Sequence, residues 1–303
     1  MELRRLGRSG TLVSVLGIGT NQVGGPVDEA GTAAILDAAQ ELGVNFIDTA
    51  ESYTEGRSEE LLGRALKGRR DQFVLATKTG ALGLPPGRLS RRQIISRLEA
   101  SLRRLATDRV DLYYLHFPDP GTDLEESLRA LEDLVRSGKV VYPAISNHPA
   151  WQVVEAMAIC DRHQFSAPVV TQNEYSLVAR APEAELLPAI DRFGLSLIPY
   201  FPLAAGFLSG KYKRGQEPPE GVRGHGNERF KNRWLTDANF DALDRFGAFA
   251  REHGREVGEL AVAWLLARPQ VCSVLTGVTS PEQLRANARA ADWKLTLEET
   301  VDL

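Results

Sequence analysis

Short runs of β-branched and other apolar residues recur along the chain, and most are followed by a segment with apolar residues at helical spacing. Strands that alternate with amphipathic helices predict a parallel sheet with helical crossovers. About eight such strands favour a (β/α)8 TIM barrel, in the α/β class, over an open doubly wound sheet. The predicted strands are Val13–Ile18, Val44–Ile47, Phe73–Thr77, Val110–Leu115, Val140–Ile145, Val169–Thr171, Leu195–Pro199 and Val271–Leu275. The predicted helical segments include Glu59–Leu66, Ile94–Leu105, Leu124–Val135, Trp151–Ala158, Phe240–Ala250 and Leu260–Leu266.

Residues typical of helix ends stand between these segments. Ser58 precedes two glutamates and is predicted to cap a helix, and Ser280 followed by Pro281 predicts the start of the last helix. The segment Gly215–Trp234 is rich in glycine, proline and charge, and we expect a long functional or mobile loop there. Nothing in the pattern separates two domains, so residues 1–303 are predicted to form a single barrel. Three glycines that follow helical runs are expected to end them: Gly43, Gly138 and Gly194.

Composition and charge exclude several classes of partner. Of 303 residues, 36 are basic and 40 acidic, and the net charge of −4 is spread along the chain. The absence of a basic run argues against nucleic acid and against an anionic membrane as partners. No apolar stretch is long enough to span a bilayer, and the N-terminus lacks the pattern of a signal peptide. Only two cysteines occur, Cys160 and Cys272, which fits a reducing, cytoplasmic location.

Ionisable side chains stand at the ends of three consecutive predicted strands. Asp48 follows the second strand and Tyr53 lies in the loop after it, Lys78 follows the third strand, and His116 follows the fourth. In a (β/α)8 barrel the carboxyl ends of all strands meet at one face. We therefore expect these four side chains to lie together, although each one taken alone is more often a loop or packing residue.

The four residue types suit the reduction of a carbonyl group. A phenol can donate a proton to a developing alkoxide, and a nearby ammonium lowers the pKa of that phenol. A carboxylate holds the ammonium in place and keeps it charged. A neutral imidazole can orient the carbonyl and stabilise charge on its oxygen. Tyr53, Lys78, Asp48 and His116 supply one of each.

The motifs around these residues resemble those of the aldo-keto reductase superfamily. Asp48–Tyr53 and Gly56–Gly63 are similar to its signature, and Leu75–Lys78 and Asp111–His116 are similar to its lysine and histidine segments. The similarity extends from roughly Leu3 to Asn287. It implies a soluble, nicotinamide-dependent carbonyl reductase in which Asp48, Tyr53, Lys78 and His116 are catalytic.

A dinucleotide would bind to loops of the barrel rather than to a Rossmann motif. The sequence from Gly17 to Gln22 has two glycines at the required spacing, but Gln22 stands where a Rossmann motif needs the third. Barrels bind phosphate with the loops after the seventh and eighth strands. The resemblance implies that Tyr200 stacks on the nicotinamide. It also implies that the side chains of Ser146, Asn147 and Gln172 bind the nicotinamide carboxamide. The implied cofactor-binding residues are Gly19, Thr20, Asn21, Ser146, Asn147, Gln172, Tyr200, Phe201, Pro202, Leu203, Gly206, Leu208, Gly277, Thr279, Gln283 and Asn287.

The resemblance implies NADPH as the cofactor and leaves NADH open. Relatives that prefer the 2′-phosphate often carry a lysine and an arginine where this chain has Gly277 and Gln283. Basic residues of the long loop offer the missing charge, although a solvated surface is an equal interpretation of them: Arg223, Arg229, Lys231 and Arg233.

The substrate is expected to be a small carbonyl compound in an open pocket. Phe117 adds an apolar wall, His148 and Pro149 stand where relatives often have an aromatic and a small residue, and little chain follows Trp293. The physiological substrate, the direction of the reaction and the oligomeric state are not predicted. Two alternatives remain open: a sugar or alcohol dehydrogenase that runs oxidatively, and a nicotinamide-binding regulatory subunit with weak turnover. A metal-dependent hydrolase is disfavoured, because the five histidines show no metal-binding spacing.

Overall fold

Eight parallel strands form a ring in the order β10-β3-β4-β5-β6-β7-β8-β9. A parallel bridge between Leu197 and Val271 joins β9 to β10 and closes the ring. The predicted (β/α)8 barrel is therefore confirmed, with each predicted strand found within a few residues of its expected place. The barrel strands are β3 (Leu16–Gly19), β4 (Phe46–Asp48), β5 (Val74–Thr79), β6 (Val110–Leu115), β7 (Val140–Ser146), β8 (Val170–Glu174), β9 (Ser196–Tyr200) and β10 (Val274–Gly277).

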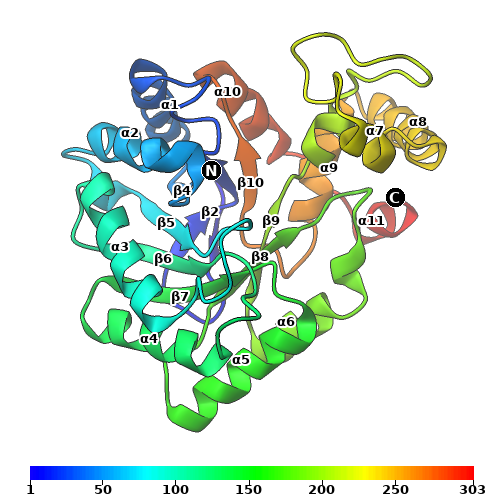
Figure 1. Ribbon diagram of the computed structural model, residues 1–303. Helices are drawn as coiled ribbons and strands as arrows, with labels where there is room; N and C mark the ends of the chain where they lie inside the picture. The colour runs from blue at the N-terminus through cyan, green and yellow to red at the C-terminus, as the bar shows by residue number, and fades with distance from the viewer.

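Helices surround the strands, as Figure 1 shows for the computed structural model. The structure describes the backbone of residues 1–303 and every side chain except those of Leu297, Val301 and Asp302. In the part of the chain it describes, no helix is long and apolar enough to cross a membrane. The helices are α1 (Glu29–Leu42), α2 (Arg57–Ala65), α3 (Arg91–Leu105), α4 (Leu124–Arg136), α5 (Ala150–His163), α6 (Leu186–Phe193), α7 (Glu228–Trp234), α8 (Asp237–Glu252), α9 (Val257–Leu266), α10 (Pro281–Ala290) and α11 (Leu297–Asp302). Short 3-10 turns are η1 (Tyr53–Gly56), η2 (Arg70–Gln72), η3 (Ala181–Glu183) and η4 (Ala204–Ser209).

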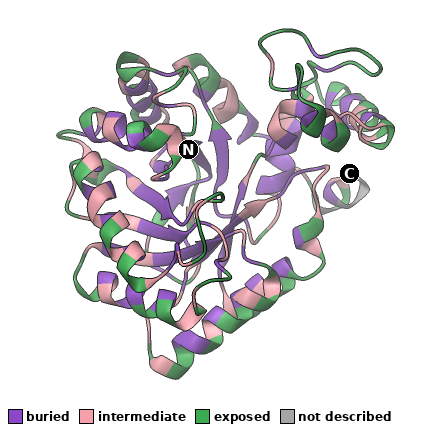
Figure 2. Cartoon of the chain, viewed as in Figure 1, coloured by how far each residue is buried: buried purple, intermediate pink, exposed green. Residues whose placement is uncertain are grey.

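Apolar side chains fill two layers, one inside the barrel and one between the strands and the helices. Alternate residues of a strand point to opposite faces, so each strand supplies both layers. Figure 2 shows the strands as buried and the outer faces of the helices as exposed. Inside the barrel, Phe46, Leu112 and Ile198 pack together. The core thus holds the strands in place from both sides and fixes where their carboxyl ends lie.

A two-stranded hairpin, β1 (Leu3–Arg5) with β2 (Leu12–Ser14), precedes the barrel. Its buried residues Leu6 and Val13 belong to the cluster inside the barrel. Arg4 donates from Nη1 to the carbonyl oxygens of Leu266 (2.8 Å) and Val271 (2.9 Å). The hairpin therefore packs against the barrel interior and is bound to residues beside the seam between β9 and β10.

Three details differ from the sequence prediction. The predicted strand Val13–Ile18 is interrupted at Val15, so that its first part pairs in the hairpin and only the second part enters the barrel. Ser58 is not the N-cap of α2, because the helix begins at Arg57 and the Ser58 hydroxyl is buried against Thr20. The predicted loop Gly215–Trp234 ends in a helix, α7, whose apolar residues Phe230 and Trp234 are buried.

The other predicted helix ends are confirmed. Ser280 caps α10 and accepts a hydrogen bond from the backbone N–H of Gln283. Gly43 and Gly194 end α1 and α6 with φ of 69° and 67°, a conformation that glycine adopts without strain. Gly138 follows α4 with φ of 76°.

Candidate active site

The four predicted catalytic side chains come from neighbouring strands and meet at the carboxyl end of the barrel. Asp48 is the last residue of β4, Lys78 lies near the end of β5, and His116 follows β6 directly. These strands are adjacent in the ring, so their ends lie side by side. Tyr53 lies in η1, in the loop between β4 and α2. The barrel thus brings together residues that are up to 68 positions apart in the chain (from Asp48 to His116).

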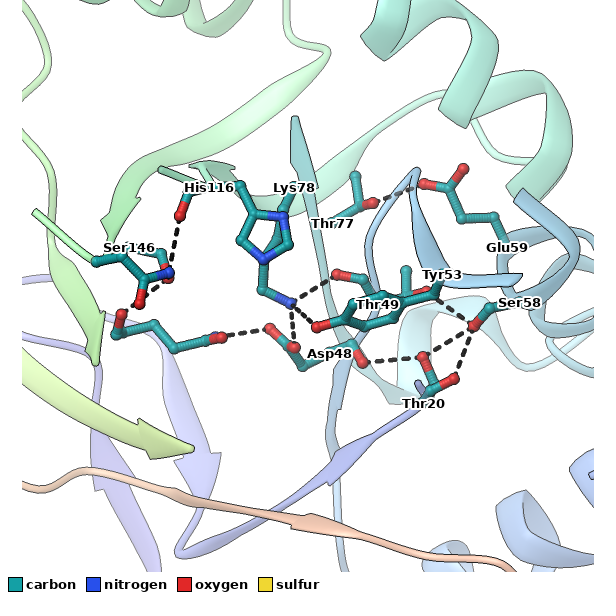
Figure 3. Close-up of polar contacts among 12 residues, drawn as sticks. Thr20, Asp48, Thr49, Tyr53, Ser58, Glu59, Thr77, Lys78, His116 and Ser146 are labelled. Atoms are coloured by element: carbon teal, nitrogen blue, oxygen red, sulfur yellow. Dashed lines mark hydrogen bonds and ion pairs between the residues drawn. The ribbon is translucent and has the colours of Figure 1, made fainter. Parts of the chain in front are cut away.

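Lys78 is the centre of the group (Figure 3). Its Nζ forms an ion pair with Asp48 and donates to the Tyr53 hydroxyl at 3.2 Å. It also donates to the backbone carbonyl of Thr49 at 2.8 Å. The Asp48 carboxylate has a second donor, because Gln172 Nε2 lies 2.9 Å from its other oxygen. Every strong partner of the buried ammonium is therefore supplied by the β4 end or the loop that follows it.

The charges around Lys78 act on the acidity of Tyr53. Burial by itself lowers the pKa of the Lys78 ammonium, but the Asp48 carboxylate and the Tyr53 hydroxyl outweigh it, and the net pKa lies above the ordinary value. Lys78 therefore stays charged. Burial raises the pKa of Tyr53, and Lys78 opposes that rise without cancelling it. The expectation that the ammonium lowers the phenol pKa holds for its own contribution, while the net pKa of Tyr53 remains raised.

His116 is held as a neutral imidazole beside Tyr53. The two rings are 6.3 Å apart and meet edge to face. Burial, helped by the nearby Lys78 charge, lowers the pKa of His116 to about 3. Its Nδ1 is buried and has no hydrogen-bond partner among the residues that the structure describes. Phe117 stacks on the imidazole at 4.8 Å. A neutral imidazole with an unpaired nitrogen can bind a polar group of a ligand.

A second polar network lies next to the first and contains the predicted carboxamide-binding residues. Asn147, with φ of 62°, donates to the carbonyl of His116 at 2.9 Å and to Ser146 Oγ at 3.0 Å. Its side-chain oxygen accepts from the Tyr200 hydroxyl at 2.7 Å. Ser146 Oγ donates to the Gln172 carbonyl at 2.8 Å. Since Gln172 also contacts Asp48, one chain of hydrogen bonds joins Tyr200 to the buried ion pair.

Most of the remaining predicted cofactor-binding residues end a barrel strand or follow one. Gly19 ends β3, Gly277 ends β10, and these two strands pair with each other. Gln283, near the start of α10, accepts hydrogen bonds from the backbone and hydroxyl of Thr279. Thr20 is buried and is bonded to the Asp48 carbonyl, so its side chain supports the loop. The others are placed by their elements: Asn21 follows β3, Asn287 is in α10, and the segment after β9 contains Phe201, Pro202, Leu203, Gly206 and Leu208.

Two basic residues of the long loop already have partners. Lys231 is paired with Glu217 and Glu228, and Arg233 with Glu174 at 2.6 Å. Arg223 lies over the Phe201 ring, 5.5 Å from its centre.

His148, expected to affect the substrate pocket, is buried and bonded through Nδ1 to the Ser146 carbonyl. Burial lowers the pKa of His148 to about 4.

Some residues of the site were not singled out from the sequence. The Thr49 carbonyl binds Lys78, but a backbone acceptor leaves no signal in the residue type. The Glu51 side chain is largely buried beside the end of β5, where it accepts hydrogen bonds from Thr79 and Gly80. It stands inside the motif that contains Asp48 and Tyr53, so a search for further ionisable residues in that motif would have found it.

A surface hollow of about 720 Å³ lies elsewhere, at the carboxyl ends of α2 and α3. It is lined by several basic residues, among them Arg64, Lys67 and Arg103, and contains none of the predicted site residues. Cations beside helix carboxyl ends are ordinary compensation for the helix dipole. The chemically matched side chains are therefore at the barrel end and not in this hollow.

This chain is similar to known proteins over most of its length. Residues 15–303 match the model of the "Aldo/keto reductase family". A "Probable voltage-gated potassium channel subunit beta" of Oryza sativa subsp. japonica is 37% identical over 96% of this chain and 92% of its own length. The "Uncharacterized oxidoreductase YrpG" of Bacillus subtilis (strain 168) is 35% identical over 98% of this chain and 93% of its own. The "Aflatoxin B1 aldehyde reductase member 2" of Rattus norvegicus is 34% identical over 91% and 79%.

Proposed function

Because the chain belongs to the aldo/keto reductase family, we propose that it reduces aldehydes or ketones with NADPH and that Tyr53 supplies the proton. Membership makes the chain an NAD(P)H-dependent oxidoreductase. The observation that carries the finer proposal is the contact of one buried ammonium, Lys78 Nζ, with both the Asp48 carboxylate and the Tyr53 hydroxyl. A phenol in contact with a fixed cation is an acid whose conjugate base is stabilised where it forms.

The residues at the strand ends fit a nicotinamide dinucleotide. Ser146, Asn147 and Gln172 offer the amide and hydroxyl groups that a carboxamide needs, and the Tyr200 ring lies next to them. Space is available at the β10 end, since a Cβ added to Gly277 would meet only Asn21 Oδ1, at 3.9 Å. When bound, the nicotinamide supplies the hydride.

The protein's own groups would then act on the carbonyl oxygen. The Tyr53 hydroxyl donates its proton to that oxygen, and Lys78 stabilises the phenolate that remains. Asp48 keeps Lys78 charged and in place. His116, neutral because its pKa is about 3, donates a hydrogen bond to the same oxygen and orients the carbonyl. Phe117, stacked on His116, excludes water from one side of the group.

NADPH is proposed as the reduced cofactor on the family resemblance, and NADH is expected to serve as well. Gly277 and Gln283 put no cation where a 2′-phosphate would be recognised. Arg285 in α10 is paired with Glu41 at 2.9 Å. Without a dedicated cation, the two cofactors should differ modestly in affinity.

Turnover with a panel of aldehydes of different bulk tests this proposal. We expect carbonyl-dependent loss of the reduced nicotinamide absorbance with either cofactor, and a rate at least about 100-fold lower in Tyr53→Phe. The variant should bind cofactor as the wild type does, because the phenol oxygen alone is removed. Undiminished turnover in Tyr53→Phe would refute the role of Tyr53, and acceptance of only one narrow size of aldehyde would refute an open pocket.

A second candidate is a nicotinamide-binding regulatory subunit with weak turnover. It is favoured by the 37% identity to the rice protein, whose name describes a potassium channel subunit. The fully paired Lys78 and the neutral His116 favour catalysis instead. The two differ in cofactor exchange: slow release of bound cofactor together with no turnover in either direction would favour the regulatory subunit. Oxidation of alcohols with NADP+ or NAD+ in the same assay tests the reverse direction.

A further inference from the structure

Glu51 joins the loop that carries Tyr53 to the strand that carries Lys78. It lies two residues before Tyr53, and its backbone N–H donates to the carbonyl of Lys78 at 3.2 Å. Its Oε1 accepts from Thr79 Oγ1 and from the backbone N–H of Gly80, both at 3.1 Å. Glu51 thus links the loop that carries Tyr53, the proposed proton donor, to the strand that carries its partner Lys78.

Arg97 of α3 is the ionic partner of this carboxylate. Its Nη1 lies 3.0 Å from Glu51 Oε1. The Glu51 side chain is only 8% exposed, and burial raises its pKa while Arg97 opposes that rise. A buried carboxylate that loses its cation is strongly disfavoured as an anion. Arg97 therefore favours the charged form of Glu51, which strengthens the two hydrogen bonds that its Oε1 accepts from Thr79 and Gly80.

The segment that follows needs such an anchor. Thr54 and Glu55 have φ of 47° and 57°, a left-handed conformation that costs about 1–2 kcal/mol for each residue with a side chain. The Thr54 hydroxyl donates to the Val23 carbonyl at 2.8 Å and accepts from the Ser58 N–H at 3.0 Å, which holds the far side of this turn. On the near side, between Asp48 and Tyr53, Glu51 is the ionisable side chain that reaches β5.

A second buried carboxylate, Glu59, is bonded to a threonine of β5 just after the loop that carries Tyr53 (Figure 3). Glu59, fully buried, accepts from Thr77 Oγ1 at 2.6 Å and is paired with Arg104 at 2.6 Å. Thr77 and Thr79 flank Lys78 on β5 and point to the face opposite to it. Arg97 and Arg104 are seven residues apart, two turns of α3, and so lie on one helix face. The proposal concerns Glu51 and Arg97, because they are next to Tyr53.

We propose that Arg97, acting through Glu51, is a positioning residue that holds the Tyr53 hydroxyl within hydrogen-bond distance of Lys78. This inference rests on the proposed function of Tyr53 as the proton donor. Without the ion pair, the strained loop relaxes and the 3.2 Å contact between Tyr53 and Lys78 lengthens. Neither Arg97 nor Glu51 touches the reacting atoms, so substrate and cofactor affinity should change little.

Arg97→Met tests the inference, because methionine keeps an apolar stem and removes the charge. We expect kcat to fall roughly 10- to 100-fold, the size of effect that a misplacement of about 1 Å produces. The KM for the aldehyde should stay within about twofold, as for an interaction made only in the transition state. Arg97→Lys, which retains a cation, should recover most of kcat. Glu51→Gln keeps the acceptor oxygen and loses the charge, so its kcat should lie between those of Arg97→Met and Arg97→Lys.

Glu132→Gln is the matched control. Glu132 is also 8% exposed, is paired with an arginine (Arg136, 2.6 Å) and accepts a backbone hydrogen bond (Ser166, 2.6 Å), but it lies on α4. It should lower the melting temperature as Glu51→Gln does and leave kcat unchanged. Equal loss of kcat in Glu51→Gln and Glu132→Gln would show a merely structural role and overturn the inference.

A readout that needs no turnover separates this inference from the proposed function. In protein labelled with ¹³C at the tyrosine ζ-carbon, the Tyr53 resonance is assigned with Tyr53→Phe. Arg97→Met should move it, and Glu132→Gln should not. A moved resonance in a protein without turnover supports the positioning role and refutes the proposed function. Wild-type turnover with an unmoved resonance and unchanged kcat in Arg97→Met refutes the positioning role alone.

Discussion

Replacing Asp48 with asparagine removes one charge from the buried ion pair and keeps the size of the side chain. Lys78 is 0% and Asp48 2% exposed, so water cannot take over the lost interaction. The amide also has a single oxygen for the two donors that now share a carboxylate, Lys78 Nζ and Gln172 Nε2. The variant therefore leaves a buried ammonium without its counterion and one donor without an acceptor.

The expected loss of stability is large. Breaking one side of a buried ion pair costs about 3–5 kcal/mol. In a chain of 303 residues this corresponds to a melting temperature roughly 5–8 °C lower. Without Asp48, burial dominates and lowers the pKa of Lys78, so the ammonium loses its proton more easily. Tyr53 then lacks a fixed cation, and kcat should fall by a factor on the order of 10²–10³.

Circular dichroism during heating, together with aldehyde turnover, measures both effects. The double variant Asp48→Asn with Lys78→Met is the decisive comparison, because it removes the isolated charge. It should regain part of the lost melting temperature and none of the lost activity. A single variant that melts within about 1 °C of the wild type would refute the reasoning, since that is the change expected for an exposed pair. A double variant less stable than the single one would refute it as well.

Three further outcomes are expected. His116 and His148 have pKa values of about 3 and about 4 in the folded protein, below the ordinary 6.5. The stability that they contribute is therefore present above pH 6.5 and is lost as the pH falls toward 4. Denaturant unfolding across this pH range should show the decline, and His148→Gln should make the dependence of stability on pH less steep. Gly277→Lys should improve the affinity for NADPH relative to NADH by about tenfold, the value of one charge-assisted hydrogen bond, as measured by fluorescence titration; an equal change for both cofactors would contradict it. Gly63→Ala should destabilise by about 1–3 kcal/mol, because its Cβ would lie 2.5 Å from the carbonyl oxygen of Arg104; an unchanged melting curve would show that α2 and α3 can separate freely.

The barrel could be predicted from the sequence because its strands are apolar on both faces and its helices on one. Helix α1 was not singled out, since its buried face consists largely of small residues such as Thr32, Ala38 and Ala39 around Ile35 and Leu36. Helix α6 contains Pro188, which discourages a helical prediction, although proline is tolerated in the first turn where it stands. Helix α7 lies in a charged segment that does not predict a helix. The structure shows that its apolar residues Phe230 and Trp234 are buried.

The grouping of the candidate catalytic residues could be predicted because one rule, that strand ends meet at one face, brings Asp48, Lys78 and His116 together. The contacts that adjust it could not. Arg97 and Glu51 are 46 residues apart, and nothing in either segment names the other as its partner. The net acidity of Tyr53 also depends on burial, which residue types alone do not give.

The N-terminal hairpin has a consequence for how the chain is made. Arg4 is bonded to carbonyl groups 262 and 267 residues further along, and Leu6 and Val13 pack inside the barrel. A chain still on the ribosome cannot make these contacts until Leu266 and Val271 have emerged. Until then the apolar side of the hairpin and both edges of the incomplete sheet are open to other chains. The hairpin thus makes completion of the barrel a late event in folding, and chaperones that cover apolar strands would be needed most just before it.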